Sequence, residues 1–195
     1  GVAFEALQAW MRGRLLDTAT VQALRTRLMA TLAAPADGAG FAQPFAALVL
    51  AEVARVDRVQ PYLDASGRAA LVDAGTRYLA GVRDYRGFDA AEGWRHGVAH
   101  GADLMLQLSL NPQLQPAQAQ ALLDAIASQV MPGGAHFYRY GEPSRLAAPV
   151  FWLGRRDSLS AAQWQAWFDA LSARQGPSEP ATESALAQRH NLGAF

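Results

Sequence analysis

Residues 92–107 decide the fold and read Glu-Gly-Trp-Arg-His-Gly-Val-Ala-His-Gly-Ala-Asp-Leu-Met-Leu-Gln. Their apolar members recur at helical spacing, so we expect a central helix from about 90 to 110. At 100° per residue, His96, His100 and Asp103 share one face of that helix. Because almost everything else around the helix is apolar or glycine, the helix is predicted to be mostly buried. Its polar groups then have to bond to one another, to neighbouring elements or to a bound group.

The remainder of the chain carries the same helical spacing between short Pro- and Gly-containing loops. We expect further helices at about 2–12, 18–32, 41–59, 67–83, 116–130, 143–153, from 161 onward and at the C-terminus. Asp17 or Thr18, Ser66 and Ser160 are suitable N-caps. Residues 135–141 alternate and are rich in aromatic side chains, which favours a short extended segment or a hairpin arm. The pattern predicts one all-α domain over residues 1–195.

Short connections between helices favour antiparallel packing of neighbours, and two arrangements satisfy that rule. The favoured one is an irregular α-α superhelix, in which antiparallel helix pairs stack as in HEAT and armadillo proteins. The alternative is a compact helical bundle. No repeated sequence unit is visible, so a superhelix would have to be irregular.

Composition excludes several classes of function. The formal net charge is zero and the arginines are scattered, which disfavours nucleic-acid binding. The chain has no lysine and no cysteine, so a Schiff base, a P-loop lysine, a thiolate metal site and a cysteine nucleophile are all excluded. No apolar run reaches the roughly 20 residues that span a bilayer. The cytoplasm and the periplasm both remain open as compartments.

Two segments resemble the signature of an uncharacterised bacterial domain family, Asp-x-Arg-Gly followed by Gly-Trp-x-His-x-x-Ala-His-Gly-Ala-Asp. The first is formed by Asp84, Arg86 and Gly87, and the second covers residues 93–103. The likeness extends over most of the chain, although Arg95 stands where the family more often has alanine. The resemblance implies a helical-repeat-like fold and a shared site, but no reaction.

The histidine pair is the first candidate site. Imidazoles four residues apart on a helix can bind one metal ion, and Asp103 would be a third ligand or would orient one imidazole. Gly97 follows His96 where the zinc-protease motif H-E-x-x-H has its general base, so the metal signal is weak. We expect no cofactor, with a divalent metal ion on His96, His100 and Asp103 as one alternative. Two buried, neutral, purely structural histidines are the other.

Five further residues are candidate ligand-binding residues. Asp84 and Arg86 precede the motif, and Arg86 is either an anion clamp or the partner of a carboxylate such as Asp103. Trp94 lies within the motif itself. Tyr138 and Arg145 belong to an aromatic and arginine-rich loop that suits a lid, or equally a loop whose rings enter the core.

Glycines at 93, 97 and 101 are spaced by four residues, which predicts close helix packing or a groove beside the histidines.

Two functions therefore stay open. The first is a small-ligand-binding or hydrolase-like site, with His96 and His100 as catalytic bases, Asp103 orienting an imidazole and Arg86 or Arg145 holding an acidic group. The second is a helical-repeat scaffold that binds a protein and uses the glycine–histidine helix only as its structural centre. The partner is accordingly an unknown small molecule or a protein, and whether the chain is an enzyme is left open.

Overall fold

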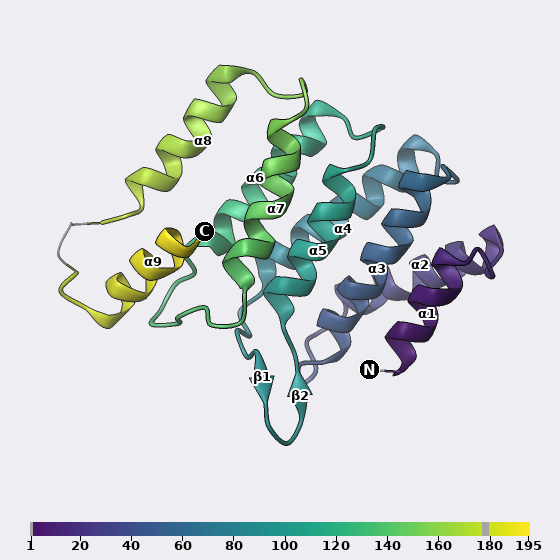
Figure 1. Cartoon of the computed structure of the whole chain (residues 1–195), viewed down its shortest axis with the longest axis horizontal. Helices are drawn as coiled ribbons and strands as arrows, with labels where there is room; N and C mark the ends of the chain where they lie inside the picture. Colours follow the sequence, from purple (N-terminus) through teal and green to yellow (C-terminus); the bar gives the residue numbers. More distant parts are fainter. Residues whose placement is uncertain (1, 177–179) are drawn as a thin grey trace.

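The computed structural model describes residues 2–176 and 180–195, and nine helices in these ranges form almost all of its regular structure (Figure 1). They are α1 (Val2–Arg12), α2 (Thr18–Ala33), α3 (Ala42–Val59), α4 (Ala65–Gly81), α5 (Gly97–Ser109), α6 (Pro116–Val130), α7 (Glu142–Gly154), α8 (Ala161–Ala173) and α9 (Glu183–Ala194). A short antiparallel hairpin joins α4 to α5 and consists of β1 (Phe88–Asp89) and β2 (Gly93–Trp94). The predicted all-α class is confirmed.

The helices form two layers. The odd-numbered helices α1, α3, α5 and α7 contact one another in that order, and α2, α4 and α6 do the same behind them (Figure 1). Helix α5 lies between α3 and α7 and also packs on α4, so it is the most enclosed helix of the front layer. These contacts establish layers and not a repeat, so the choice between a superhelix and a bundle stays a prediction.

Most helix ends follow from local sequence. The side chains of Asp17 and Ser160 accept hydrogen bonds from backbone N–H groups in the first turns of α2 and α8, as expected. Pro116 begins α6, where its missing N–H costs nothing. The N-cap of α4 is Asp64 and not Ser66, because the Asp64 carboxylate accepts from the Gly67 N–H and leaves the serine hydroxyl to bond to that carboxylate.

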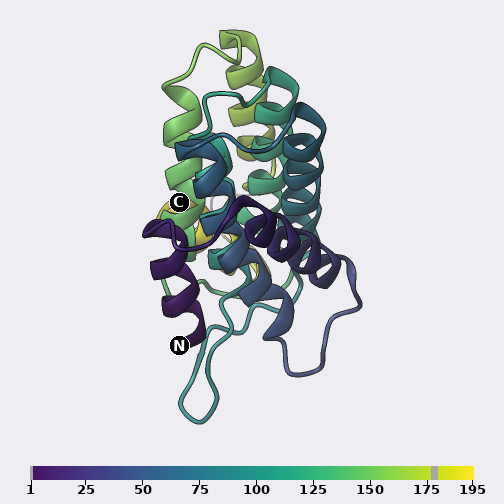
Figure 2. The ribbon, with the colours of Figure 1, turned by 90° about the vertical axis from the view of Figure 1, so that its right-hand side faces the viewer.

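The central helix is shorter than its apolar pattern predicts. It begins at Gly97, and the segment expected to form its first two turns is instead the β1–β2 hairpin, which projects away from the helices in both views (Figures 1 and 2). His96 separates the two, with a left-handed backbone conformation (φ 56°) that an α-helix excludes. Gly93 also has a positive φ and lies in β2, so only Gly97 and Gly101 of the three glycines are helical.

Those two helical glycines serve close packing. A methyl group on Gly101 would come within 2.9 Å of Leu79 in α4, and one on Gly97 would meet Tyr78 and Val82. The two glycines therefore allow close packing against α4, as one of the two predictions had it. They do not face a groove beside the histidines, which was the other.

Residues 135–141 form an irregular loop instead of the expected extended arm. Gly176 and Pro180 predict a loop after α8, and most of this segment lies outside the described residues. The helix expected near the C-terminus is present as α9.

Candidate functional site: a cleft between helices α1, α3, α5 and α7

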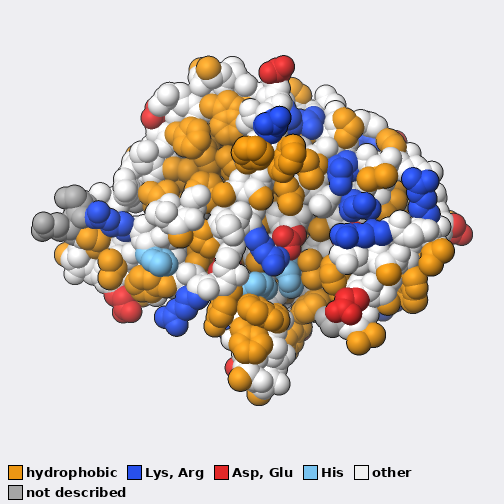
Figure 3. All heavy atoms as spheres, in the orientation of Figure 1, with side chains coloured by type: hydrophobic (Ala, Val, Ile, Leu, Met, Phe, Trp, Pro, Cys, Tyr) orange, Lys and Arg blue, Asp and Glu red, His pale blue; other side chains and the backbone are white. Residues whose placement is uncertain are grey.

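A cleft of about 410 Å³ opens on the front layer, and both His100 and Asp103 line it. Four helices supply its walls. The lining residues are Phe4, Gln8, Arg12, Leu48, Ala51, Glu52, His100, Asp103, Leu106, Gln107 and Arg145. On the corresponding face, histidine, arginine and acidic side chains gather in one hollow above the hairpin (Figure 3).

His100 is a neutral imidazole with an unused nitrogen. It is buried, its ring makes an edge contact with Phe45, and its Nδ1 has no hydrogen-bond partner among the described residues. Burial lowers the pKa of His100 to about 3, helped by the nearby His96 and Arg145 and opposed by a hydrogen bond at the Pro44 backbone. A histidine with this pKa is a weak base at neutral pH, so proton acceptance at His100 is disfavoured.

Among the described residues, Asp103 forms an ion pair with Arg145 alone. Its Oδ2 accepts a hydrogen bond of 2.7 Å from Nη1 of Arg145, which reaches over from the first turn of α7. Burial raises the pKa of Asp103 to about 6, because its cost to the carboxylate exceeds the stabilisation by Arg145. Asp103 therefore changes protonation state close to neutral pH.

Glu52 lines the same cleft, but its pKa is lowered where that of Asp103 is raised. Its carboxylate accepts from Nε and Nη2 of Arg12 and from the side-chain amide of Gln8, so α1 is bound to α3 through it. Burial alone would raise the pKa of Glu52, but the hydrogen bonds from Arg12 and Gln8 and the charges of Arg12 and Arg55 outweigh it and lower that pKa.

His96 lies next to His100 even though it precedes the helix. The two ring centroids are 5.8 Å apart, and the ring of Trp94 packs on His96 at 4.4 Å. The Nε2 atom of His96 lies 3.7 Å from the buried carboxylate of Glu142 and has no hydrogen-bond partner among the described residues. Burial lowers the pKa of His96, with Glu142 opposing and Arg145 adding to the effect.

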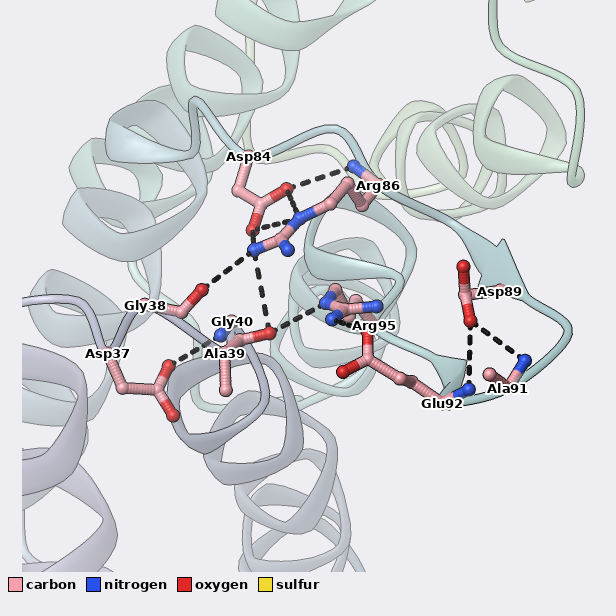
Figure 4. Close-up of polar contacts among 10 residues, drawn as sticks. All are labelled: Asp37, Gly38, Ala39, Gly40, Asp84, Arg86, Asp89, Ala91, Glu92 and Arg95. Carbon is pink, nitrogen blue, oxygen red and sulfur yellow. Dashed lines mark hydrogen bonds and ion pairs between the residues drawn. The ribbon is translucent and has the colours of Figure 1, made fainter.

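Asp84 and Arg86 form their own pair away from the cleft (Figure 4). The Arg86 guanidinium donates to the Asp84 carboxylate and to the carbonyls of Gly38 and Ala39, and pairs with neither Asp103 nor Glu92. Gly40 has a positive φ here, and a methyl group on it would lie 2.5 Å from the Asp84 carboxylate. The resemblance motif at 84–87 therefore fastens the base of the hairpin to the loop before α3.

The remaining predicted ligand-binding residues lie in different surroundings. Tyr138 is buried, and its hydroxyl donates to the Gln129 carbonyl while its backbone N–H donates to the Asn191 side chain. A larger cavity, about 630 Å³, lies between α2, α3 and α4 and has chiefly apolar walls, with Asp84 among its polar members. It touches neither His100 nor Asp103, so size alone does not identify the site with the ionisable groups.

Three important residues were not singled out by sequence reasoning. Arg95 is buried, donates to the Ala39 carbonyl, pairs with Glu92 and lies over the Phe41 ring at 4.5 Å. Glu52 and Glu142 are buried carboxylates that reach the site from α3 and α7. Glu52 is the one charged residue in the apolar stretch from Phe45 to Ala54 of α3, and this was the available signal for it.

No set of three or more histidine, aspartate or glutamate side chains in the described ranges is arranged to hold a metal ion. His96 contacts His100, and His100 lines the cleft together with Asp103. Asp103 pairs with Arg145, whereas His96 lies beside Glu142.

Comparison with known proteins gives one match. Residues 14–195 match the model of a family described as "Protein of unknown function (DUF2785)", which covers most of the chain. Neither the curated proteins nor the solved structures contain a match. Within the described residues, none of the helices combines the length and the apolar character that crossing a membrane requires.

Proposed function

The chain belongs to the DUF2785 family of proteins of unknown function, and we propose that its cleft between α1, α3, α5 and α7 binds a small polar ligand that exchanges a proton with Asp103. Buried polar atoms around the cleft lack partners within the described residues, which is the observation that carries the proposal. These atoms are Nδ1 of His100 and Oε1 of Gln107. Since buried polar groups are normally paired, we expect both side chains to turn toward a bound molecule, which would then supply the missing partner.

Arg145 and Asp103 supply the charges for such a ligand. The guanidinium makes one hydrogen bond to Asp103, and its remaining N–H groups are available to an acidic or hydroxyl oxygen. An ionised carboxylate beside it only accepts hydrogen bonds, so the two together suit a ligand that has both donors and acceptors.

Hydrolysis is the reaction that fits these groups. A carboxylate with a pKa of about 6 can accept a proton from an attacking water and return it to a leaving group. His100 is a poor base because burial disfavours its protonated form, so the proton-carrying role passes from His100 to Asp103. In this proposal His100 orients the ligand through a hydrogen bond.

Calorimetry with acetate, phosphate, glycine and N-acetylglucosamine as probes tests the binding role. We expect Asp103→Asn and Arg145→Gln to weaken whichever probes bind, and the wild-type affinity to change around pH 6. Asp169→Asn and Arg139→Gln remove the same charges from exposed positions that do not line the cleft, so they are matched controls. Probe affinities that are unchanged in both cleft variants, or no binding by any probe, would overturn the proposal.

A protein-binding scaffold is the second candidate, and one observation favours it. Phe151, Trp152 and Phe168 are large apolar side chains left exposed on α7 and α8, and Arg155 lies over the first two rings. The rings of Phe151 and Trp152 are in contact, and exposed apolar groups of this size are typical of protein contacts. Under this function Phe151→Ser and Trp152→Ser would abolish recovery of a partner, and Asp103→Asn would leave it intact.

A further inference from the structure

Three aromatic side chains stand exposed where the hairpin meets the helices, and we call Phe88, Trp94 and Tyr140 the aromatic platform. Their exposed fractions are 49%, 44% and 40%. The Trp94 ring lies 5.0 Å from Phe88 and 5.3 Å from Tyr140, measured between centroids. Apolar side chains cover much of the projecting hairpin in the space-filling view (Figure 3). Such rings normally pack into a core, so their shared exposure calls for a partner.

The platform adjoins the proposed cleft. Trp94 packs on His96 at 4.4 Å, His96 lies 5.8 Å from His100, and His100 lines the cleft together with Asp103 and Arg145. These contacts link Trp94 to the cleft wall through two buried rings at the start of α5, so a ligand that extends from the cleft past this end of α5 would reach the platform.

The platform is fixed in place. Tyr140 lies directly over Gly87, where a methyl group would penetrate its ring, and its backbone N–H donates to Glu142 at 2.9 Å. Arg95 follows Trp94 and anchors β2 through its bond to the Ala39 carbonyl (Figure 4). Rings held in this way lose little conformational entropy when a ligand stacks on them.

We infer that the ligand of the cleft is a saccharide, with one sugar ring stacked on Trp94 beside Tyr140, whose ring stands perpendicular to it, and with the neighbouring sugar bound by Asp103, Arg145, His100 and Gln107. The inference rests on the proposed function. A sugar ring presents C–H groups on its faces and hydroxyl groups at its rim. The C–H faces suit aromatic surfaces, and the hydroxyls both donate and accept, which matches carboxylate, guanidinium, imidazole and amide partners.

Electrostatics favour a saccharide over a membrane surface as the partner of these rings. The turn of the hairpin carries Asp89, whose carboxylate accepts from the backbone N–H groups of Ala91 and Glu92, and Glu92 itself is exposed apart from its contact with Arg95. Two carboxylates at the tip oppose approach to an anionic bilayer. A purely aromatic ligand would leave Asp103 and Arg145 unused.

Titration calorimetry with cellohexaose, chitohexaose, maltohexaose and xylohexaose tests the inference on the full chain. We expect at least one of them to bind with a Kd of about 1 mM or below. Trp94→Ala should weaken that binding about tenfold through loss of the stacking surface, and Trp94→Tyr should weaken it less. Trp152→Ala is the matched control, because Trp152 is 41% exposed and lies on α7 away from the cleft lining.

Each outcome separates this inference from the proposed function. Absence of saccharide binding, combined with acetate or phosphate binding that needs Asp103, overturns the saccharide and keeps the cleft. Saccharide binding that needs Trp94 but is unchanged in Asp103→Asn and Arg145→Gln overturns the cleft and its ligand. Equal losses of saccharide affinity in Trp94→Ala and Trp152→Ala would overturn the role of the aromatic platform in binding. So would Trp94-dependent sedimentation with phosphatidylcholine–phosphatidylglycerol vesicles when no saccharide binds.

Discussion

Two ion pairs line one cleft, and they hold their carboxylates in opposite ways. On the α1–α3 side, Glu52 accepts hydrogen bonds from Nε and Nη2 of Arg12 and from the Gln8 amide, and its pKa is lowered. On the α5–α7 side, Asp103 accepts one bond from Arg145, and burial raises its pKa to about 6. Glu52 has more hydrogen bonds and a second nearby cation, Arg55, and together these outweigh burial on that side, whereas Arg145 alone does not outweigh burial at Asp103.

The difference separates a structural pair from a functional candidate. Glu52 is saturated by the chain and joins two helices, whereas Asp103 and its neighbour His100 have unused bonding capacity. Carboxylates whose surroundings push their pKa values apart are typical of acid–base sites. Variants of these residues can make the hydrogen bonding and the pKa values of Glu52 and Asp103 more alike or more different.

The largest expected effect concerns His100 and acid stability. Its pKa is 6.5 when unfolded and about 3 when folded, so the unfolded state binds the extra proton between these values. The stability that neutral His100 contributes is complete above pH 6.5 and is lost as the pH falls toward 3. Relative to wild type, His100→Gln should lose less of its unfolding free energy between pH 7 and pH 4, by roughly 3 kcal/mol.

Urea unfolding of both proteins across that range measures the difference. Asp103 acts in the opposite direction, because its folded pKa lies above the unfolded value of 3.8, so its proton stabilises the fold as the pH falls below 6. Subtracting the two curves removes the Asp103 contribution to first order. Parallel curves for wild type and His100→Gln would show that His100 is not held neutral by the fold.

Breaking the Glu52–Arg12 pair should lower the unfolding free energy more than breaking the Asp103–Arg145 pair. Glu52→Gln removes the charge that Arg12 and Gln8 share, and we expect a loss of about 2 kcal/mol in unfolding free energy. The value is below that of a fully enclosed pair because the Arg12 side chain is half exposed. Urea unfolding at pH 7 measures it, and Glu183→Gln at the first residue of α9, outside the cleft, provides the control. A loss as small as that of the control would remove the structural role of the pair.

The fold was largely predictable because its signals are local. Apolar spacing, Asp17 and Ser160 as caps and Pro116 as a helix start each act within a few residues. The predicted start of α5 was wrong, because the spacing of apolar residues in 90–96 is by itself compatible with a helix. Contacts distant in sequence, Arg95 with Ala39 and Arg86 with Gly38, help to fix them as a hairpin, and a single sequence does not display those contacts.

The candidate site was predictable in part for the same reason. His100 and Asp103 share a helix face by spacing, and His96 reaches the same neighbourhood from the turn before the helix. Glu52 and Glu142 come from α3 and α7, far along the chain, and only tertiary packing brings them near the histidines. The pairing of Arg145 with Asp103 likewise depends on how α7 packs against α5, whereas Arg86 pairs with Asp84 only two residues away.

Removing the charge on the unsaturated side should stabilise the protein at neutral pH. Asp103 is ionised at pH 7 although the folded state disfavours that form, so Asp103→Asn should gain about 1 kcal/mol in unfolding free energy while it loses ligand binding. The exposed Asp169→Asn should change stability by less than about half of that amount. A clear destabilisation by Asp103→Asn, measured by urea unfolding at pH 7, would place Asp103 in the same structural class as Glu52.

The smallest expected effect tests the electrostatic link inside the second pair. Arg145 is the group that lowers the pKa of Asp103 against the effect of burial, so Arg145→Gln should raise that pKa above about 6. The stability change at pH 5 should be within a few tenths of a kcal/mol, since Asp103 is then mostly protonated in the folded state. Carboxyl ¹³C chemical shifts recorded against pH report the pKa directly, with Arg139→Gln as the charge-matched control. An Asp103 pKa that falls or stays constant in Arg145→Gln would mean that Arg145 does not control the protonation of this carboxylate, and the contrast with Glu52 would then rest on burial alone.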